Sequence, residues 1–177
     1  MVEEHLSIER PSQIEPAELT SLVLLINDVY DEAEAGMWKE TGVRTTETEL
    51  RAMFVEEGLI IARLGGKIVG SVHVSKMEKS GEFGMLIVDP KVRKQAIGGK
   101  LVQAAEQWAK SEGFDVMRLE ILTPRTWNHP TKEFIKGWYT RLGYVPQKTE
   151  AFEEMYPHLV EKLATDCDFT PWLKPLI

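Results

Sequence analysis

The segment with the clearest chemical potential is residues 88–101, where an apolar stretch gives way to a basic loop and then a glycine pair. Gly98 and Gly99 open a pattern with helical spacing, and Arg93 and Lys94 precede them. The first N–H groups of a helix have no partner within it, and the helix dipole adds partial positive charge. Such a strand–loop–helix is typical of an anion site, although a plain turn with solvated cations fits this segment equally well.

Two familiar phosphate loops are excluded for this segment. A Walker loop ends in Gly-Lys-Ser/Thr, whereas Gly99-Lys100 is followed by Leu101. The G-x-G-x-x-G pattern of dinucleotide-binding proteins is absent as well. The segment alone therefore indicates an anion without identifying it.

A second candidate segment is aromatic and ends in a glycine. Trp138 and Tyr139 are followed by Gly143 and Tyr144, and apolar residues before them have helical spacing. A tyrosine hydroxyl stays protonated at neutral pH, so Tyr139 is a candidate proton donor. The alternative is that Tyr139 is one more aromatic residue on the core-facing stripe of its helix.

The patterns of the first half predict elements that position both segments. Pro16, followed by apolar residues at helical spacing, predicts a first helix, and Thr46 with Glu49 forms a capping box for a second. Apolar and alternating runs predict three strands, the first two joined by a Gly65-Gly66 hairpin turn. The strands are expected at residues 59–64, 67–74 and 83–88.

The second half continues with alternating helices and strands. A helix is expected from Ile97 to its stop at Gly113, and the later elements are a strand at 116–122, a helix at 134–142, a short strand at 144–145 and a helix at 151–163. Residues 167–173 are expected to return as an edge strand, because Pro171 limits pairing. The order predicts a mixed α/β sheet with helices on its faces, in a single domain spanning residues 1–177.

Composition excludes several classes of function. The formal charge of −7 disfavours nucleic-acid binding and suits a cationic substrate. No apolar run reaches the ~20 residues that span a membrane, and the acidic start of the chain does not resemble a leader peptide. The single cysteine, Cys167, forms no internal disulfide, so a cytoplasmic location is expected. The histidines lack ligand spacing with each other or with Cys167, so no metal site is predicted.

The two candidate segments together resemble the GNAT superfamily of acetyl-CoA-dependent N-acetyltransferases. Arg93, Ala96 and Gly98 occupy the places of its Arg/Gln-x-x-Gly-x-Gly/Ala motif, preceded by Val-Asp-Pro at residues 88–90. The stretch from Trp138 to Tyr144 resembles the family's aromatic-Tyr-x-x-x-Gly-Phe/Tyr signature, and the order of elements agrees over most of the chain.

Two positions depart from the family pattern. Ala96 replaces the commoner first glycine and adds a methyl group where the backbone meets pyrophosphate. Lys132 stands where many members carry an asparagine near the coenzyme, and that role is assigned neither to Lys132 nor to Asn128.

The resemblance implies a GNAT fold with a mixed, mostly antiparallel sheet flanked by helices, and acetyl-CoA as acyl donor. It makes Tyr139 the acid that protonates the coenzyme A thiolate, and it places oxyanion donors in the backbone near Ile87 and Val88. The coenzyme-binding residues expected are Ile87, Val88, Arg93, Lys94, Gln95, Ala96, Ile97, Gly98, Gly99 and Lys100.

An attacking amine must lose a proton, and Glu82 is the first candidate for the base. A glutamate stands at this offset before the motif in family members that acetylate histones. Glu120 is the second candidate, since it alternates with the apolar face of its strand. A solvated Glu82, a Glu120 that merely pairs with Arg118, and an ordered water chain in place of a base all stay open.

The resulting prediction is an enzyme that transfers acetyl to a primary amine of a small molecule or peptide through a tetrahedral intermediate. A longer acyl group, a non-catalytic acyl-CoA-binding or regulatory module, and an interaction domain without coenzyme are the alternatives. Residues 31–45 and 125–132 are expected to shape the acceptor site, whose amine is unspecified. Dimers are common in the family, so a homodimer is left open.

Overall fold

The computed structural model describes residues 4–177, apart from the side chains of Arg93 and Lys94. The strands are β1 (Leu6–Glu9), β2 (Leu59–Leu64), β3 (Lys67–Lys76), β4 (Gly81–Val88), β5 (Val116–Pro124), β6 (Val145–Pro146), β7 (Glu150–Ala151) and β8 (Cys167–Pro175). The α-helices are α1 (Pro16–Ala33), α2 (Glu47–Val55), α3 (Ile97–Ser111), α4 (Pro130–Arg141) and α5 (Phe152–Met155), and two 3₁₀ segments are η1 (Pro90–Gln95) and η2 (Pro157–Lys162).

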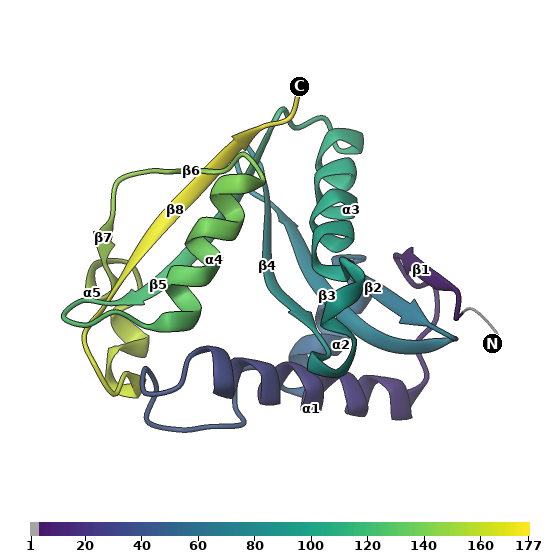
Figure 1. The fold of residues 1–177 in the computed structure, drawn as a ribbon, viewed down its shortest axis with the longest axis horizontal. Helices are drawn as coiled ribbons and strands as arrows, with labels where there is room; N and C mark the ends of the chain where they lie inside the picture. Colours follow the sequence, from purple (N-terminus) through teal and green to yellow (C-terminus); the bar gives the residue numbers. More distant parts are fainter. Residues whose placement is uncertain (1–3) are drawn as a thin grey trace.

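All the strands belong to one sheet in the order β1-β2-β3-β4-β5-β8-β6, with β7 also paired to β8. The β4–β5 pairing is parallel, and the other pairings are antiparallel. The predicted mixed, mostly antiparallel sheet is therefore confirmed. Figure 1 shows α3 and α4 beside the middle of the sheet, while α1 crosses below the ends of β4 and β5.

Helices cover both faces of the sheet. The larger hydrophobic cluster joins α3 and α4 to strands β2 to β5, with Leu101, Ala105 and Tyr139 among its buried members. A second cluster joins α1 and α2 to β2 and β4 on the other face, through residues such as Ile26 and Leu50. The sheet is thus the middle of three layers.

Local sequence signals explain the helix starts and the first hairpin. Pro16 occupies the first turn of α1, where its missing N–H costs nothing. Thr46 caps α2, accepting a 3.2 Å hydrogen bond from the backbone N–H of Glu49 in the predicted capping box. Gly65 and Gly66 turn β2 into β3 with φ angles of 58° and 82°, values that glycine adopts readily.

The predicted helix over residues 151–163 is wrong. The segment consists of the single turn of α5 and the 3₁₀ turns of η2. Pro157 is the first residue of η2, and a proline inside an α-helix would remove a hydrogen bond and clash with the preceding turn. Three further elements, β1, β7 and η1, were not predicted.

The predicted edge position of residues 167–173 is also wrong. β8 lies inside the sheet, paired with β5 along its length and with β6 and β7 on its other side. Pro171 fits there because neither neighbouring strand pairs with it: β6 pairs with residues 172–173 and β7 with residues 168–169. The Pro171 carbonyl accepts a 2.8 Å hydrogen bond from the Gln147 N–H. A proline in an inner strand is tolerated where the neighbouring strand is interrupted.

Candidate active site

Strand β4 contains one extra residue relative to β3, and this bends it away from β5. Ser71 of β3 pairs with Ile87 of β4, and His73 pairs with Gly84, so one residue lies between the pairs on β3 and two lie between them on β4. Met85 takes a left-handed backbone conformation there, with φ of 49°, as in a β-bulge. Over the described residues β4 pairs with β5 only at Gly81 and Glu82, and the two strands then diverge toward α1 (Figure 1).

A cleft of about 860 Å³ lies where β4 and β5 separate. Its walls include members of both large hydrophobic clusters, such as Phe83 and Ile87, and of a third cluster around Phe152. Apolar walls of this size with a few polar groups are typical of small-molecule sites.

Helix α3 begins at one end of this cleft. Ala96, Gly98 and Gly99 line the cleft, and the N–H groups of the first helical turn have no partner within the helix. No acidic side chain lies in that turn. Lys100 is exposed next to it, so the helix dipole and a nearby cation both favour an anion here.

The glycines of this turn fit close approach by a phosphate. A methyl group added to Gly99 would meet nothing within 4 Å, which means the backbone is open on that side. A methyl group on Gly98 would lie 3.5 Å from the Trp138 ring, an ordinary contact. Ala96 stands in the left-handed region, with φ of 55° and ψ of 25°, where glycine is favoured.

The structure places the other predicted coenzyme residues around this turn. Ile87 and Val88 line the cleft from β4, and Ile97 is fully buried in the core beneath the turn. Gln95 is exposed at the end of η1. The side chains of Arg93 and Lys94 lie outside the described part of the chain.

Tyr139 projects from α4 into the same cleft and is 7% exposed. Its ring packs against Trp138 and Phe83, with centroids 5.0 and 6.0 Å away. Burial raises the pKa of Tyr139, and the neighbouring Tyr30 adds to the rise, so the hydroxyl stays neutral. Tyr139 is therefore both a packed aromatic residue of the core and a residue that lines the cleft, so its position agrees with both interpretations.

Glu82 and Glu120 share one cation at the point where β4 and β5 part. Arg118 contacts the Glu82 carboxylate and donates a 2.7 Å hydrogen bond to Glu120. Both carboxylates line the cleft, and Tyr156 donates a 2.8 Å hydrogen bond to Glu120. Burial raises the pKa of Glu82 against the opposing effect of Arg118, and the charge of Glu120 raises it further. A carboxylate with a raised pKa is a better proton acceptor than an ordinary glutamate.

A buried ion pair closes the cleft between α1 and α4. Lys132 contacts Glu34, and their side chains are 8% and 7% exposed. Glu34 also accepts a 3.1 Å hydrogen bond from the Trp38 indole. His129 caps α4 through Thr131 N–H, and its other ring nitrogen lies 3.1 Å from the Ala35 carbonyl. These contacts fix the end of α1 against the start of α4.

Two further cleft residues were not singled out from the sequence, although one of them lies in the loop 31–45 that was expected to shape the acceptor site. Tyr30, near the end of α1, and Arg44, in the loop before α2, both line the cleft. The Arg44 guanidinium lies 4.7 Å from the centre of the Tyr30 ring. Tyr30 has the spacing of a core residue on its helix, and the position of Arg44 depends on a loop path that the sequence does not determine.

Other reactive side chains do not form a second site. Cys167 is fully buried, and burial raises the pKa of its thiol to about 11. Burial lowers the pKa of His73, which lines the cleft as a neutral imidazole. Within residues 4–177, no three His, Cys, Asp or Glu side chains gather as a metal site, and no helix has the length and apolar character to cross a membrane.

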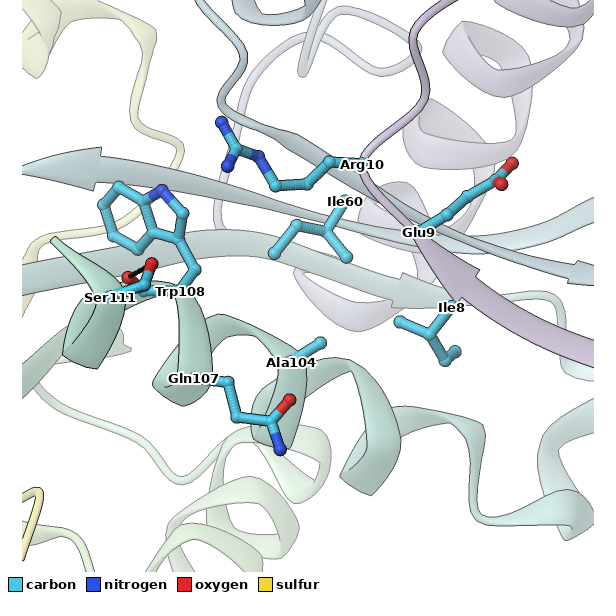
Figure 2. Close-up of a pocket in the computed structure, with 8 residues that line it drawn as sticks. All are labelled: Ile8, Glu9, Arg10, Ile60, Ala104, Gln107, Trp108 and Ser111. Carbon is cyan, nitrogen blue, oxygen red and sulfur yellow. Dashed lines mark hydrogen bonds between the residues drawn. The ribbon is translucent and has the colours of Figure 1, made fainter.

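A second hollow of about 300 Å³ lies between the β1 region and α3 (Figure 2). Figure 2 shows Trp108 and Gln107 of α3 on one side and Ile8 and Arg10 on the other. Arg10 donates hydrogen bonds to the Glu57 carbonyl. The hollow contains none of the predicted site residues, so the cleft between β4 and β5 is the candidate active site.

Comparison with known proteins identifies a family and a fold. The model of the acetyltransferase (GNAT) family matches residues 24–144. No curated protein sequence matches the chain. Among solved structures, paiA N-acetyltransferase from Thermoplasma acidophilum, in complex with coenzyme A, has a TM-score of 0.71 at 15% identity, covering 97% of this chain and 99% of that one.

Two other similar structures are longer than this chain. A Bacillus anthracis protein assigned as a streptothricin acetyltransferase, in complex with acetyl coenzyme A, has a TM-score of 0.53 at 23% identity, over 66% of this chain and 61% of that one. N-acetylglutamate synthase from Neisseria gonorrhoeae, complexed with coenzyme A and N-acetyl-glutamate, has a TM-score of 0.65 at 14% identity, over 98% of this chain and 35% of that one. At these identities the likeness shows the fold alone.

Proposed function

The chain belongs to the GNAT family of acetyltransferases, and from this premise we propose that it transfers acetyl from acetyl-CoA to a primary amine of a small molecule or peptide. The observation that carries the proposal is the position of Glu82 and Tyr139 in one cleft with the open first turn of α3. A proton acceptor, a hydroxyl donor and an anion site are groups that can each serve acetyl transfer from acetyl-CoA to an amine.

The first turn of α3 would hold the pyrophosphate of the coenzyme. The free N–H groups of Ile97, Gly98 and Gly99 provide donors, and Lys100 provides charge. The open backbone at Gly99 and the absence of acids in that turn fit this role. The divergence of β4 from β5 leaves β4 backbone near Ile87 and Val88 free of β5, where the reactive arm of the coenzyme would lie.

Acetyl-CoA supplies an activated acetyl group, and the residues of the chain manage the protons. An alkyl amine is mostly protonated at neutral pH, so it must lose a proton before attack. Glu82, with its raised pKa, is the proposed acceptor of that proton, directly or through water. Glu120 is the alternative acceptor in the same group of contacts.

Tyr139 is proposed to act on the departing sulfur. Its raised pKa keeps the hydroxyl neutral, so it is available as a donor throughout the pH range of an assay. A tyrosine pKa above ~10 exceeds the ~8.5 of a typical thiol, so the hydroxyl stabilises the thiolate mainly by hydrogen bonding. When the sulfur takes the Tyr139 proton as the thiol leaves, solvent returns a proton to the hydroxyl and the proton held by Glu82 passes to solvent. The net change is one proton moved from the amine to the thiol.

Thermal unfolding with and without acetyl-CoA tests the coenzyme site, with adenosine diphosphate as control. A ligand at 100 times its dissociation constant stabilises the fold by about 2.7 kcal/mol. We expect a shift specific to acetyl-CoA, followed by amine-dependent release of thiol. A shift without turnover for any amine would instead identify a non-catalytic acyl-CoA-binding module, and no shift would refute the coenzyme site.

A further inference from the structure

We propose that the acceptor is a primary amine carried on an aromatic or long apolar body, an inference that rests on the proposed acetyl transfer. The cleft continues beyond Glu82 and Glu120 to an aromatic wall, which we define as six residues from four parts of the chain. The aromatic wall consists of Trp38, Leu122, Phe152, Tyr156, Leu159 and Phe169.

The aromatic wall is a built surface. Phe152 packs against Trp38 and Tyr156, with ring centroids 6.0 and 5.3 Å away, and Phe169 lies 5.7 Å from Tyr156. Phe152 and Phe169 are 4% and 2% exposed, so the rings are held in place by packing. Rigid aromatic side chains bind apolar groups at low entropic cost.

The aromatic wall lies at the far end of the cleft from the proposed coenzyme site. Helix α3 packs on β3 and β4, whereas α5 packs on β8. Figure 1 shows α5 beyond β5, on the side away from α3. Since the pyrophosphate would lie at the first turn of α3, the aromatic wall is left for the acceptor.

Charge at the middle of the cleft indicates where the amine lies. Glu82 and Glu120 share the single guanidinium of Arg118, which leaves one negative charge in excess in this group. The Tyr156 hydroxyl turns toward Glu120, so the polar edge of the aromatic wall meets the carboxylates. An ammonium would meet the carboxylates while its apolar body contacts the rings.

The aromatic wall itself contains no charged side chain to bind a second ionic group on the acceptor. Of the charged groups elsewhere in the cleft, Lys132 and Glu34 bind each other, and Arg44 lies against the Tyr30 ring. A diamine or an acidic amino acid would therefore place its second charge against apolar rings, at a cost in desolvation. The acceptor class that fits best has one amine and an apolar remainder.

The first test measures kcat/KM for propylamine, pentylamine and heptylamine with acetyl-CoA, and then for phenethylamine. The linear amines have nearly the same basicity, so differences among them report burial of the chain. A buried methylene contributes ~0.8 kcal/mol, which predicts an increase of about fourfold per methylene. A flat series, or a preference for 1,4-diaminobutane or glutamate, would overturn the inference.

The second test compares two adjacent variants on η2. Leu159→Gln places a polar group in the aromatic wall, whereas Val160→Gln changes a side chain that is 38% exposed and outside the cleft. We expect Leu159→Gln to lower the heptylamine-to-propylamine ratio at least tenfold and Val160→Gln to leave it unchanged. Equal ratios in both variants would exclude the aromatic wall as the acceptor site.

The two proposals fail in different ways. If acetyl-CoA shifts the melting temperature and some amine is acetylated without regard to its apolar body, only the acceptor class is wrong. If no amine is acetylated, the proposed function is wrong, and the acceptor class falls with it.

Discussion

Replacing Lys132 by methionine should destabilise the protein by an amount that separates a buried ion pair from a surface one. Lys132 and Glu34 are 8% and 7% exposed, and the Trp38 indole provides the only other hydrogen bond to the Glu34 carboxylate among the described residues. Lys132→Met removes the cation and leaves the carboxyl buried. Methionine retains most of the volume of lysine, so the effect reports lost pairing more than a cavity.

Breaking a buried pair by removing one partner typically costs about 3–5 kcal/mol. For a chain of this size each kcal/mol lowers the melting temperature by about 2–4 °C, so a fall of roughly 6–20 °C is expected. Combining Lys132→Met with Glu34→Gln should recover most of the loss, because glutamine still accepts the Trp38 hydrogen bond and has no charge.

Urea unfolding of wild type, both single variants and the double variant gives the coupling energy. Lys136→Met is the matched control in the same helix, since Lys136 pairs with Glu133 at 3.0 Å with side chains 37% and 50% exposed. The control should cost less than about 0.5 kcal/mol. A Lys132→Met variant within about 1 kcal/mol of wild type, or a double variant no more stable than the single one, would refute the reasoning.

Three other changes probe the site. Ala96→Gly should remove a backbone strain of ~1–2 kcal/mol, because Ala96 is in the left-handed region, at an entropy cost of ~0.5–1 kcal/mol for the added glycine. Calorimetry should therefore show a gain in stability of about 0.5–1 kcal/mol, and a loss of stability would contradict the strain. Tyr139→Phe should lower kcat about 100-fold or more with little change in acetyl-CoA affinity; an unchanged kcat in steady-state assays would assign Tyr139 to packing alone. Glu82 accepts a proton only when it is ionised, and its pKa is raised, so kcat should fall as the pH drops through a value above ~4.3. Glu82→Gln should remove this fall at low pH, and a fall that persists in the variant points to Glu120.

The sequence predicted the elements whose signals are local. The capping box at Thr46, the Gly65-Gly66 turn and the stripe of α3 are each determined by a few neighbouring residues. The position of β8 depends instead on which distant strand it pairs with. Pro171 indicated an edge, yet the interrupted neighbours that tolerate it are set by tertiary structure.

The candidate site was predictable to the same extent. Tyr139, Glu82 and the glycine turn stand on regular elements, and the structure brings them to one cleft. The bulge at Met85 leaves no mark in an ordinary apolar strand sequence. The aromatic wall was missed because Phe152 and Tyr156 were assigned to a long helix, and its assembly depends on loop paths and on β8.

The interior position of β8 also has a consequence for how the molecule acquires its structure in time. β5 cannot complete its pairing until β8, which follows α4 and all of residues 125–166 in the chain, has reached it. Contacts between segments so far apart in sequence form slowly, and during synthesis the amino-terminal half emerges first. The first turn of α3, where we propose that the coenzyme binds, can therefore form on β2–β4 while β5 still exposes an unpaired edge. Until β8 inserts, that edge is a site for mispairing with other chains, and Phe169 completes the aromatic wall only at this last step.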